Sequence, residues 1–138
     1  MKTKVILLVL LMSSIASSQT ADDYYKKGLE FANNGKYDEA ITEMKKALDL
    51  DPKSARYHLN LGVIYANKKD YDEAIKEVES SISIDTDSII AHYVLAMLYE
   101  KKKNNDKAIG EWEKVLKLNP LEEMKKFAEK HIRRLKEK

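Results

Sequence analysis

The sequence predicts an all-α protein built from three copies of a helix hairpin. Three stretches of the chain align at a spacing of 34 residues, which places Gly28, Gly62 and Ala96 in register. Each stretch has apolar residues at helical intervals, then a short polar turn such as residues 34–36, then a second helical pattern. One hairpin cannot cover its own apolar stripe, so the repeat indicates a stack of hairpins.

The first eighteen residues have the layout of a secretory signal peptide. Lys2 and Lys4 precede an unbroken apolar run at residues 5–12, and residues 13–18 are small and polar apart from Ile15. The run is shorter than the roughly 20 residues that a membrane-spanning helix needs, so we expect the leader to be removed. The small residues required before the cut favour cleavage after Ser18 or Ala16, which predicts a secreted or periplasmic protein. Retention of the leader as a membrane anchor is the alternative.

Removal of the leader changes the charge balance. The whole chain has 25 basic and 23 acidic residues, and the loss of Lys2 and Lys4 leaves 23 of each. A neutral mature chain gives no reason to expect nucleic acid or an anionic membrane as a partner. The chain has no cysteine, so neither a lipid-modified cysteine nor a disulfide is available. We therefore expect no stable membrane anchoring after cleavage, and stability from helix packing alone.

The residues at the repeat positions suit closely packed helices. We place the repeats at residues 21–54, 55–88 and 89–120. Small residues recur where two helices must approach, aromatic residues recur farther along the pair, and prolines follow the second helices of the first and third repeats. The first repeat has Tyr24, Gly28, Phe31, Ala40, Met44, Ala47 and Pro52. The second has His58, Leu61, Gly62, Tyr65, Ala74, Val78 and Ser81. The third has His92, Leu95, Ala96, Tyr99, Ala108, Trp112 and Pro120.

This pattern resembles the tetratricopeptide repeat (TPR) family over almost all of the mature chain. The departures are mild: Lys27 replaces the usual leucine, Thr86 replaces proline, and Ser81 and Val115 replace alanine. The resemblance implies a right-handed superhelix of three TPR helix hairpins, whose first helices line a concave protein-binding surface.

A capping helix is predicted at residues 121–138. Its apolar residues fall on one stripe at helical spacing, while most of the others are charged: Leu121, Met124, Phe127, Ala128, Ile132 and Leu135. We expect this helix to pack on the third repeat with a solvated basic outer face. Binding of an acidic partner by that face is the alternative.

The concave surface implied by the resemblance contains an apolar strip at Leu29, Val63 and Met97, which are equivalent positions of the three repeats. We predict that this groove docks a peptide or a helix of another protein. The predicted groove residues are Tyr25, Leu29, Asn33, Arg56, Leu59, Asn60, Val63, Asn67, Ile90, Tyr93, Val94, Met97 and Lys101. Coverage of the strip by the cap helix or the N-terminal residues is an alternative. A structural module that self-assembles through its terminal helices, as a homo-oligomer, is another.

A known carboxylate-binding subtype of the family uses Lys, Arg and Asn residues on the first helices. Asn60 stands at one such position, but Tyr25, Leu29, Ile90 and Val94 occupy places where the clamp needs polar side chains. We therefore expect no binding of chaperone C-termini by that clamp.

The sequence offers no catalytic constellation, so we predict no enzyme, no cofactor and no metal site. It has three histidines, and no serine lies in a nucleophile-elbow motif. His58 and His92 are equivalent positions of adjacent repeats, so they should lie roughly 8–10 Å apart, which is awkward for a shared metal. No carboxylate is expected beside them, and both are interpreted as packing residues. His131, in the cap, has no evident partner and is interpreted as structural.

Overall fold

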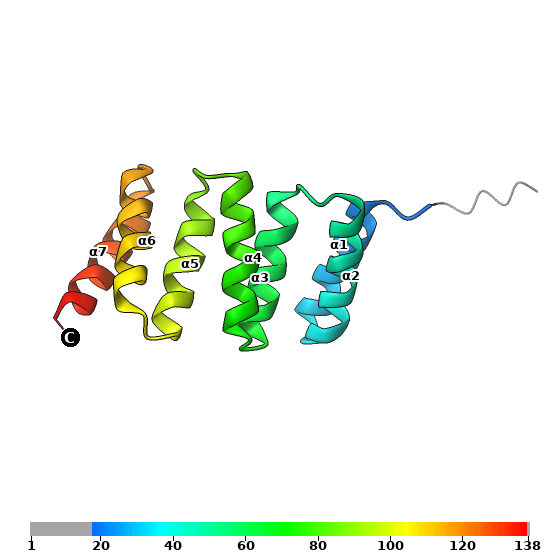
Figure 1. Ribbon diagram of the computed structural model, residues 1–138, viewed down its shortest axis with the longest axis horizontal. Helices are drawn as coiled ribbons and strands as arrows, with labels where there is room; N and C mark the ends of the chain where they lie inside the picture. Colours follow the sequence, from blue (N-terminus) through cyan, green and yellow to red (C-terminus); the bar gives the residue numbers. More distant parts are fainter. Residues whose placement is uncertain (1–17, 138) are drawn as a thin grey trace, which may run out of the picture.

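The computed structural model describes residues 18–137, which form seven α-helices and contain no strand (Figure 1). The helices are α1 (Ala21–Asn33), α2 (Tyr37–Leu50), α3 (Ala55–Asn67), α4 (Tyr71–Ile84), α5 (Ile89–Lys101), α6 (Asn105–Lys117) and α7 (Glu122–Lys136). This confirms the predicted all-α hairpin repeat. The leader, apart from Ser18, lies outside the described residues. None of the described helices has the length and hydropathy needed to cross a membrane.

Local sequence explains where the helices begin. Thr20 and Asp23 form a capping box at α1, in which each side chain accepts a hydrogen bond from the other residue's backbone N–H. Ser54 and Ser88 accept from the third residue of α3 and α5 in the same way. These caps satisfy backbone groups that a helix start otherwise leaves unpaired, so the three first helices begin in register.

The turn inside each hairpin needs a left-handed backbone at one position. Gly35 takes it in the first repeat with φ +72°, as its place in the predicted turn suggests. Lys69 and Lys103 take the same position in the second and third repeats, with φ +67° and +58°. All three hairpins therefore share one turn geometry, although only the first has the residue that adopts it without strain.

Each hairpin closes around small residues. Ala40, Ala74 and Ala108 are completely buried on the second helices. A Cβ at Gly62 would lie 2.6 Å from Val78 Cγ2, so the close approach of α3 and α4 requires glycine there. The predicted role of small residues in helix contact thus has a direct steric basis.

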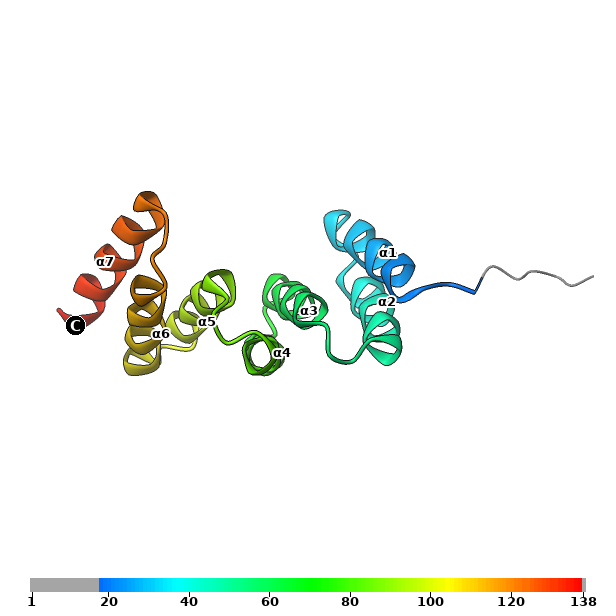
Figure 2. The ribbon, with the colours of Figure 1, turned by 90° about the horizontal axis from the view of Figure 1, so that it is seen from above.

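The hairpins stack into an arc. Seen from above, α1, α3, α5 and α7 lie along its inner edge, and α2, α4 and α6 lie along its outer edge (Figure 2). A stripe of large apolar residues on α3 is buried within the stack: Tyr57, Leu61 and Ile64. The equivalent positions of α1 carry exposed charged residues: Asp23, Lys27 and Glu30. The first hairpin therefore presents a solvated face at the point where a preceding repeat would pack.

The C-terminal helix α7 occupies the place of a first helix in a fourth hairpin. It packs on α6, and its first residue lies 33 positions after the first residue of α5. The earlier first helices, α1, α3 and α5, start 34 residues apart. Phe127 lies 5.7 Å from the ring of Trp112 and 5.6 Å from that of Tyr93, measured between ring centroids. One expectation for the cap was wrong: Leu121 precedes the helix as its N-cap and is 83% exposed.

Glu100 connects α5, α6 and α7. One carboxylate oxygen accepts from Trp112 Nε1 at 2.8 Å and lies 2.6 Å from His131 Nδ1. The other oxygen pairs with Arg134. Burial raises the pKa of the Glu100 carboxyl, but the hydrogen bonds from Trp112 and His131 together with nearby positive charge hold it below its ordinary value. An ionised Glu100 therefore helps to hold the cap helix in place.

Candidate protein-binding groove

Two pockets lie along the seam between α3 and α5, the central first helices. The Met97 pocket has a volume of about 260 Å³ and is lined by Val63, Ala66, Asn67, Tyr71, Tyr93, Val94, Met97, Leu98 and Lys101. The Ile90 pocket has a volume of about 240 Å³ and is lined by Ala55, Arg56, Leu59, Ser81, Asp85, Ser88 and Ile90. Both pockets have mainly apolar walls with a few polar groups, as ligand sites in proteins usually do.

Nine of the thirteen predicted groove residues line these pockets. Six of them belong to the Met97 pocket and three to the Ile90 pocket. Leu29, Asn33 and Asn60 line neither pocket. The amide nitrogen of Asn60 donates to the backbone oxygen of Arg56 at 2.9 Å, so part of its hydrogen-bonding capacity is used within α3. The one residue that matches the carboxylate clamp is thus partly committed to its own helix.

Tyr25 is a packing residue rather than an open groove residue. Its side chain is 8% exposed, and its ring stacks on Tyr57 with the centroids 4.8 Å apart. Because α1 and α3 meet here, the ring fills the contact between the first two hairpins. Its exposed neighbour is Arg56, whose guanidinium lies 4.5 Å from the centre of the Tyr25 ring.

The apolar strip is only partly covered by neighbouring helices. Leu29, Val63 and Met97 are half-buried, and the last two face the Met97 pocket. The cap helix reaches the edge of this pocket, since Phe127 contacts Tyr93. The cap helix thus packs against Tyr93 without lining the pocket, and the space over Val63 and Met97 can receive another group.

Charged groups flank the pockets unequally. Arg56 pairs with Asp22 at 3.2 Å, and its pKa is raised by a hydrogen bond to Tyr57 and by nearby negative charge. The pKa of Asp22 is lowered by a hydrogen bond from Lys26 and by the Arg56 charge. Lys101 is exposed and makes no ion pair within residues 18–137. Of the two basic groove residues, Arg56 is therefore already paired, whereas Lys101 is available to pair with a ligand.

The histidines have carboxylate partners that were not expected from the sequence. His58 Nδ1 lies 2.8 Å from Glu77, and His92 Nδ1 lies 2.6 Å from Glu111. The expectation that no carboxylate stands beside them was therefore wrong. His131 likewise has a partner, because its ring contacts Glu100. The missed signal was the recurrence of His and Glu 19 residues apart in the second and third repeats.

These histidine pairs form hydrogen bonds within the stack. The second ring nitrogen of His58 lies 3.0 Å from the backbone oxygen of Pro52, and that of His92 lies 2.8 Å from Thr86. Each ring thus joins a second helix to the loop that enters its hairpin. Residues 18–137 contain no group of three or more potential His, Cys, Asp or Glu ligands for a metal.

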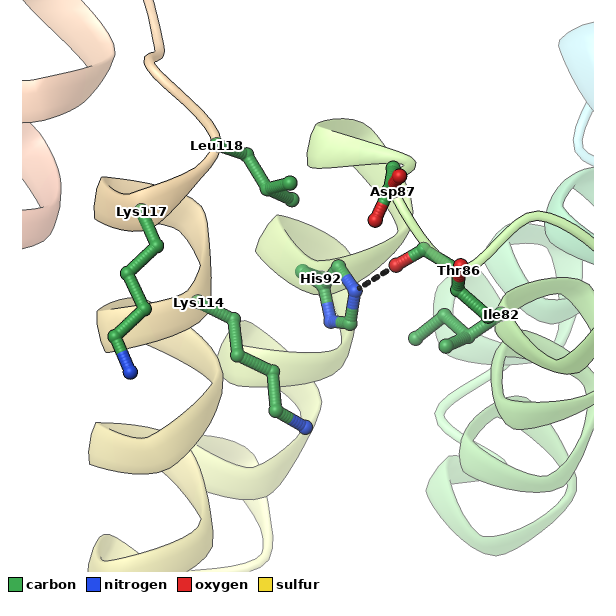
Figure 3. Close-up of a pocket in the computed structure, with 7 residues that line it drawn as sticks. All are labelled: Ile82, Thr86, Asp87, His92, Lys114, Lys117 and Leu118. Carbon is green, nitrogen blue, oxygen red and sulfur yellow. Dashed lines mark hydrogen bonds between the residues drawn. The ribbon is translucent and has the colours of Figure 1, made fainter.

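A larger pocket lies away from the predicted groove. It has a volume of about 380 Å³ and is lined by residues of α4, α5, α6 and the adjoining loops: Ile82, Thr86, Asp87, His92, Lys114, Lys117 and Leu118 (Figure 3). The ammonium of Lys114 is 2.8 Å from Glu111, and the carboxylate of Asp87 also belongs to this region. This pocket contains both acidic and basic side chains, and the ring of His92 is already hydrogen-bonded within the fold. Its larger volume therefore does not make it a better candidate for partner binding than the two pockets of the α3–α5 seam.

The stacked hairpins with a concave seam define an α-helical repeat protein. Two models of the tetratricopeptide repeat match the chain, over residues 25–89 and 89–122. The chain belongs to the tetratricopeptide repeat family. No curated protein matches it.

Solved structures share the fold at low sequence identity. The first TPR domain of Spaghetti (RPAP3) bound to the HSP90 peptide SRMEEVD is 24% identical, with a TM-score of 0.78, over 87% of this chain and 93% of that one. The type III secretion chaperone SycD of Yersinia enterocolitica, in complex with a peptide of the translocator YopD, is 18% identical, with a TM-score of 0.77, over 83% and 91%. MamA protein is 28% identical, with a TM-score of 0.69, over 72% and 54%.

Proposed function

We propose that this protein is an extracytoplasmic adaptor that docks a peptide or helix of a partner protein in its concave groove. The observation that carries the proposal is the Met97 pocket, where half-buried Val63 and Met97 face a solvent-accessible space between α3 and α5. Filling this space removes apolar surface from water, which favours binding without any covalent step.

Proteins with the same fold support this type of activity. The Spaghetti domain and SycD are both described with a bound peptide. The shared fold therefore supports peptide docking, and the chemistry of the partner depends on the groove residues of this chain.

The ends of the stack favour docking over self-assembly through terminal helices. At the first end, Asp23, Lys27 and Glu30 occupy the positions that are apolar and buried on α3. At the other end, α7 exposes charged residues along most of its length: Glu122, Glu123, Lys125, Lys126, Glu129, Lys130, Arg133 and Lys136. Stacking a second copy on either end would bury charges, which costs free energy unless each one is paired.

The extracytoplasmic setting rests on the predicted leader. A basic start, a short apolar run and small residues before a cut are the features that secretory signal peptides share. Amino-terminal sequencing of the protein purified from its native host tests this directly. An intact Met1 on the accumulated protein would contradict secretion with cleavage.

The docking function is tested by placing a charge in the groove. We expect Val63→Asp and Met97→Asp each to abolish capture of partner proteins, because a carboxylate cannot be buried in an apolar pocket without a large cost. Leu50→Asp is the matched control, since Leu50 is an apolar residue that is 58% exposed at the end of α2. Capture should persist in this control.

Two measurements separate the alternatives. If the groove variants lose helical circular dichroism, Val63 and Met97 are core residues and the docking surface lies elsewhere. Light scattering over a wide concentration range tests assembly. A stable oligomer that dissociates in a variant of α1 or α7, and not in the groove variants, would favour the self-assembling module.

A further inference from the structure

The two pockets of the α3–α5 seam have a defined separation. The Met97 pocket uses the C-terminal half of α3 and the middle and C-terminal part of α5, and the Ile90 pocket uses the N-terminal ends of both helices. The two sets of lining residues are offset by about eight residues along either helix, which corresponds to about 12 Å at about 1.5 Å per residue. A single bound segment can therefore place one apolar side chain in each pocket.

The charges along the seam differ between its two ends. Among the residues lining the Met97 pocket, Lys101 is the one charged side chain. The Ile90 pocket contains both Arg56 and Asp85, and Arg56 is already paired with Asp22. The Met97 end therefore has a positive charge available for a ligand, whereas the Ile90 end has a cation that is already paired and the carboxylate of Asp85.

We propose that the docked segment lies along the α3–α5 seam with two large apolar anchors about 12 Å apart and an Asp or Glu next to the anchor in the Met97 pocket. This rests on the docking function proposed above and adds the chemistry and the direction of the partner. In an extended segment the anchors are about four residues apart, because each residue advances about 3.4 Å. In a helical segment they are about seven or eight residues apart.

The anchors supply affinity and the charge sets direction. Burying one large apolar side chain strengthens binding by about tenfold or more. An exposed ion pair such as one with Lys101 changes the Kd by at most about fivefold. It nevertheless disfavours the reversed orientation, in which the acidic group would lie beside Asp85.

A display library of random 12-residue peptides, selected on the purified chain, tests the proposal. We expect enriched peptides to carry two large apolar residues at one of the two spacings, with an acidic residue beside one of them. Fluorescein-labelled copies then give Kd values by anisotropy. Ile90→Asp and Met97→Asp should each weaken binding about tenfold or more. Lys101→Glu should weaken it about two- to fivefold and favour peptides with lysine in place of the acidic residue.

The matched control is Lys45→Glu, which reverses an exposed charge on α2. This variant should bind the selected peptides with unchanged affinity. Circular dichroism of every variant should match that of the parent, so that a lost fold is not read as a lost contact.

The outcomes separate this proposal from the docking function. If no peptide is enriched, or if the enriched peptides bind Met97→Asp as tightly as the parent, docking in the groove is refuted and this proposal falls with it. If peptides depend on Met97 but not on Ile90, or carry basic residues beside the anchor, the groove binds peptides and the chemistry proposed here is wrong. Equal effects of Lys101→Glu and Lys45→Glu would also overturn it.

Discussion

Gly62 offers a sharp test of hairpin packing, because a single methyl group has no room there. A Cβ at this position would lie 2.6 Å from Val78 Cγ2 and 3.1 Å from the backbone oxygen of Ala74. Val78 is completely buried and β-branched, so it cannot rotate away at low cost. The methyl group can be accommodated only if α3 and α4 move apart.

The three glycines that lie in helices form a graded series. Overpacking costs about 1–3 kcal/mol, and replacing a glycine inside a helix by alanine gains about 0.5–1 kcal/mol. We therefore expect Gly62→Ala to destabilise the fold by about 1–2 kcal/mol. At Gly28 the nearest atom is the flexible Met44 Cε, at 3.1 Å, so the two effects should nearly cancel. A Cβ added at Gly110 in α6 would meet no atom within 4 Å outside its own helix turn, and Gly110→Ala should stabilise the fold by the full helical gain.

Urea unfolding followed by circular dichroism measures the three free energies under one set of conditions. Gly110→Ala is the control for helix propensity, because it adds the same methyl group without a contact. The predicted order of stability is Gly110→Ala, Gly28→Ala, Gly62→Ala. If Gly62→Ala is as stable as Gly110→Ala, then α3 and α4 are not as closely packed as described, and the reasoning from the Val78 contact is refuted.

Two further predictions concern buried charge. The pKa of Glu100 lies below its ordinary value of 4.5, so the ionised carboxylate stabilises the fold above pH 4.5, and this contribution is lost as the pH falls through the lowered pKa. Glu100→Gln should cost about 1–3 kcal/mol at pH 7. Urea unfolding at pH 3 should show a smaller difference between this variant and the parent. His92→Leu should cost about 1–3 kcal/mol, because Glu111 loses the bond to His92 while its other carboxylate oxygen stays paired with Lys114. His58→Leu should cost less, since the His58 side chain is 18% exposed against 5% for His92. Equal losses in thermal unfolding would contradict this dependence on burial.

The groove shows which site residues can be predicted from sequence. Val63, Met97 and Lys101 are predicted to lie together because equivalent positions of a repeat fall on one surface, and they line one pocket. Tyr71 was missed because it belongs to a second helix, which the pattern assigns to the outer side of the arc. Tyr25 has a groove position in its repeat, but contact with Tyr57 buries it.

The sequence by itself determined the helical hairpins, their number and the face that each helix buries. These properties depend on residue spacing within about 34 positions, and the same spacing occurs three times, so each repeat supports the interpretation of the others. The family and the all-α fold follow from the same pattern, and both are confirmed.

Only the tertiary structure decided which residues meet across repeats. The pairing of His92 with Glu111, the contact of Phe127 with Tyr93 and the three-helix contact of Glu100 depend on side-chain directions between helices. A helical period places a residue on a face, but the distance to a neighbouring helix is set by the side chains of both helices together. For the same reason the sequence predicted an apolar strip, while the two separate pockets within it became visible only in the folded chain.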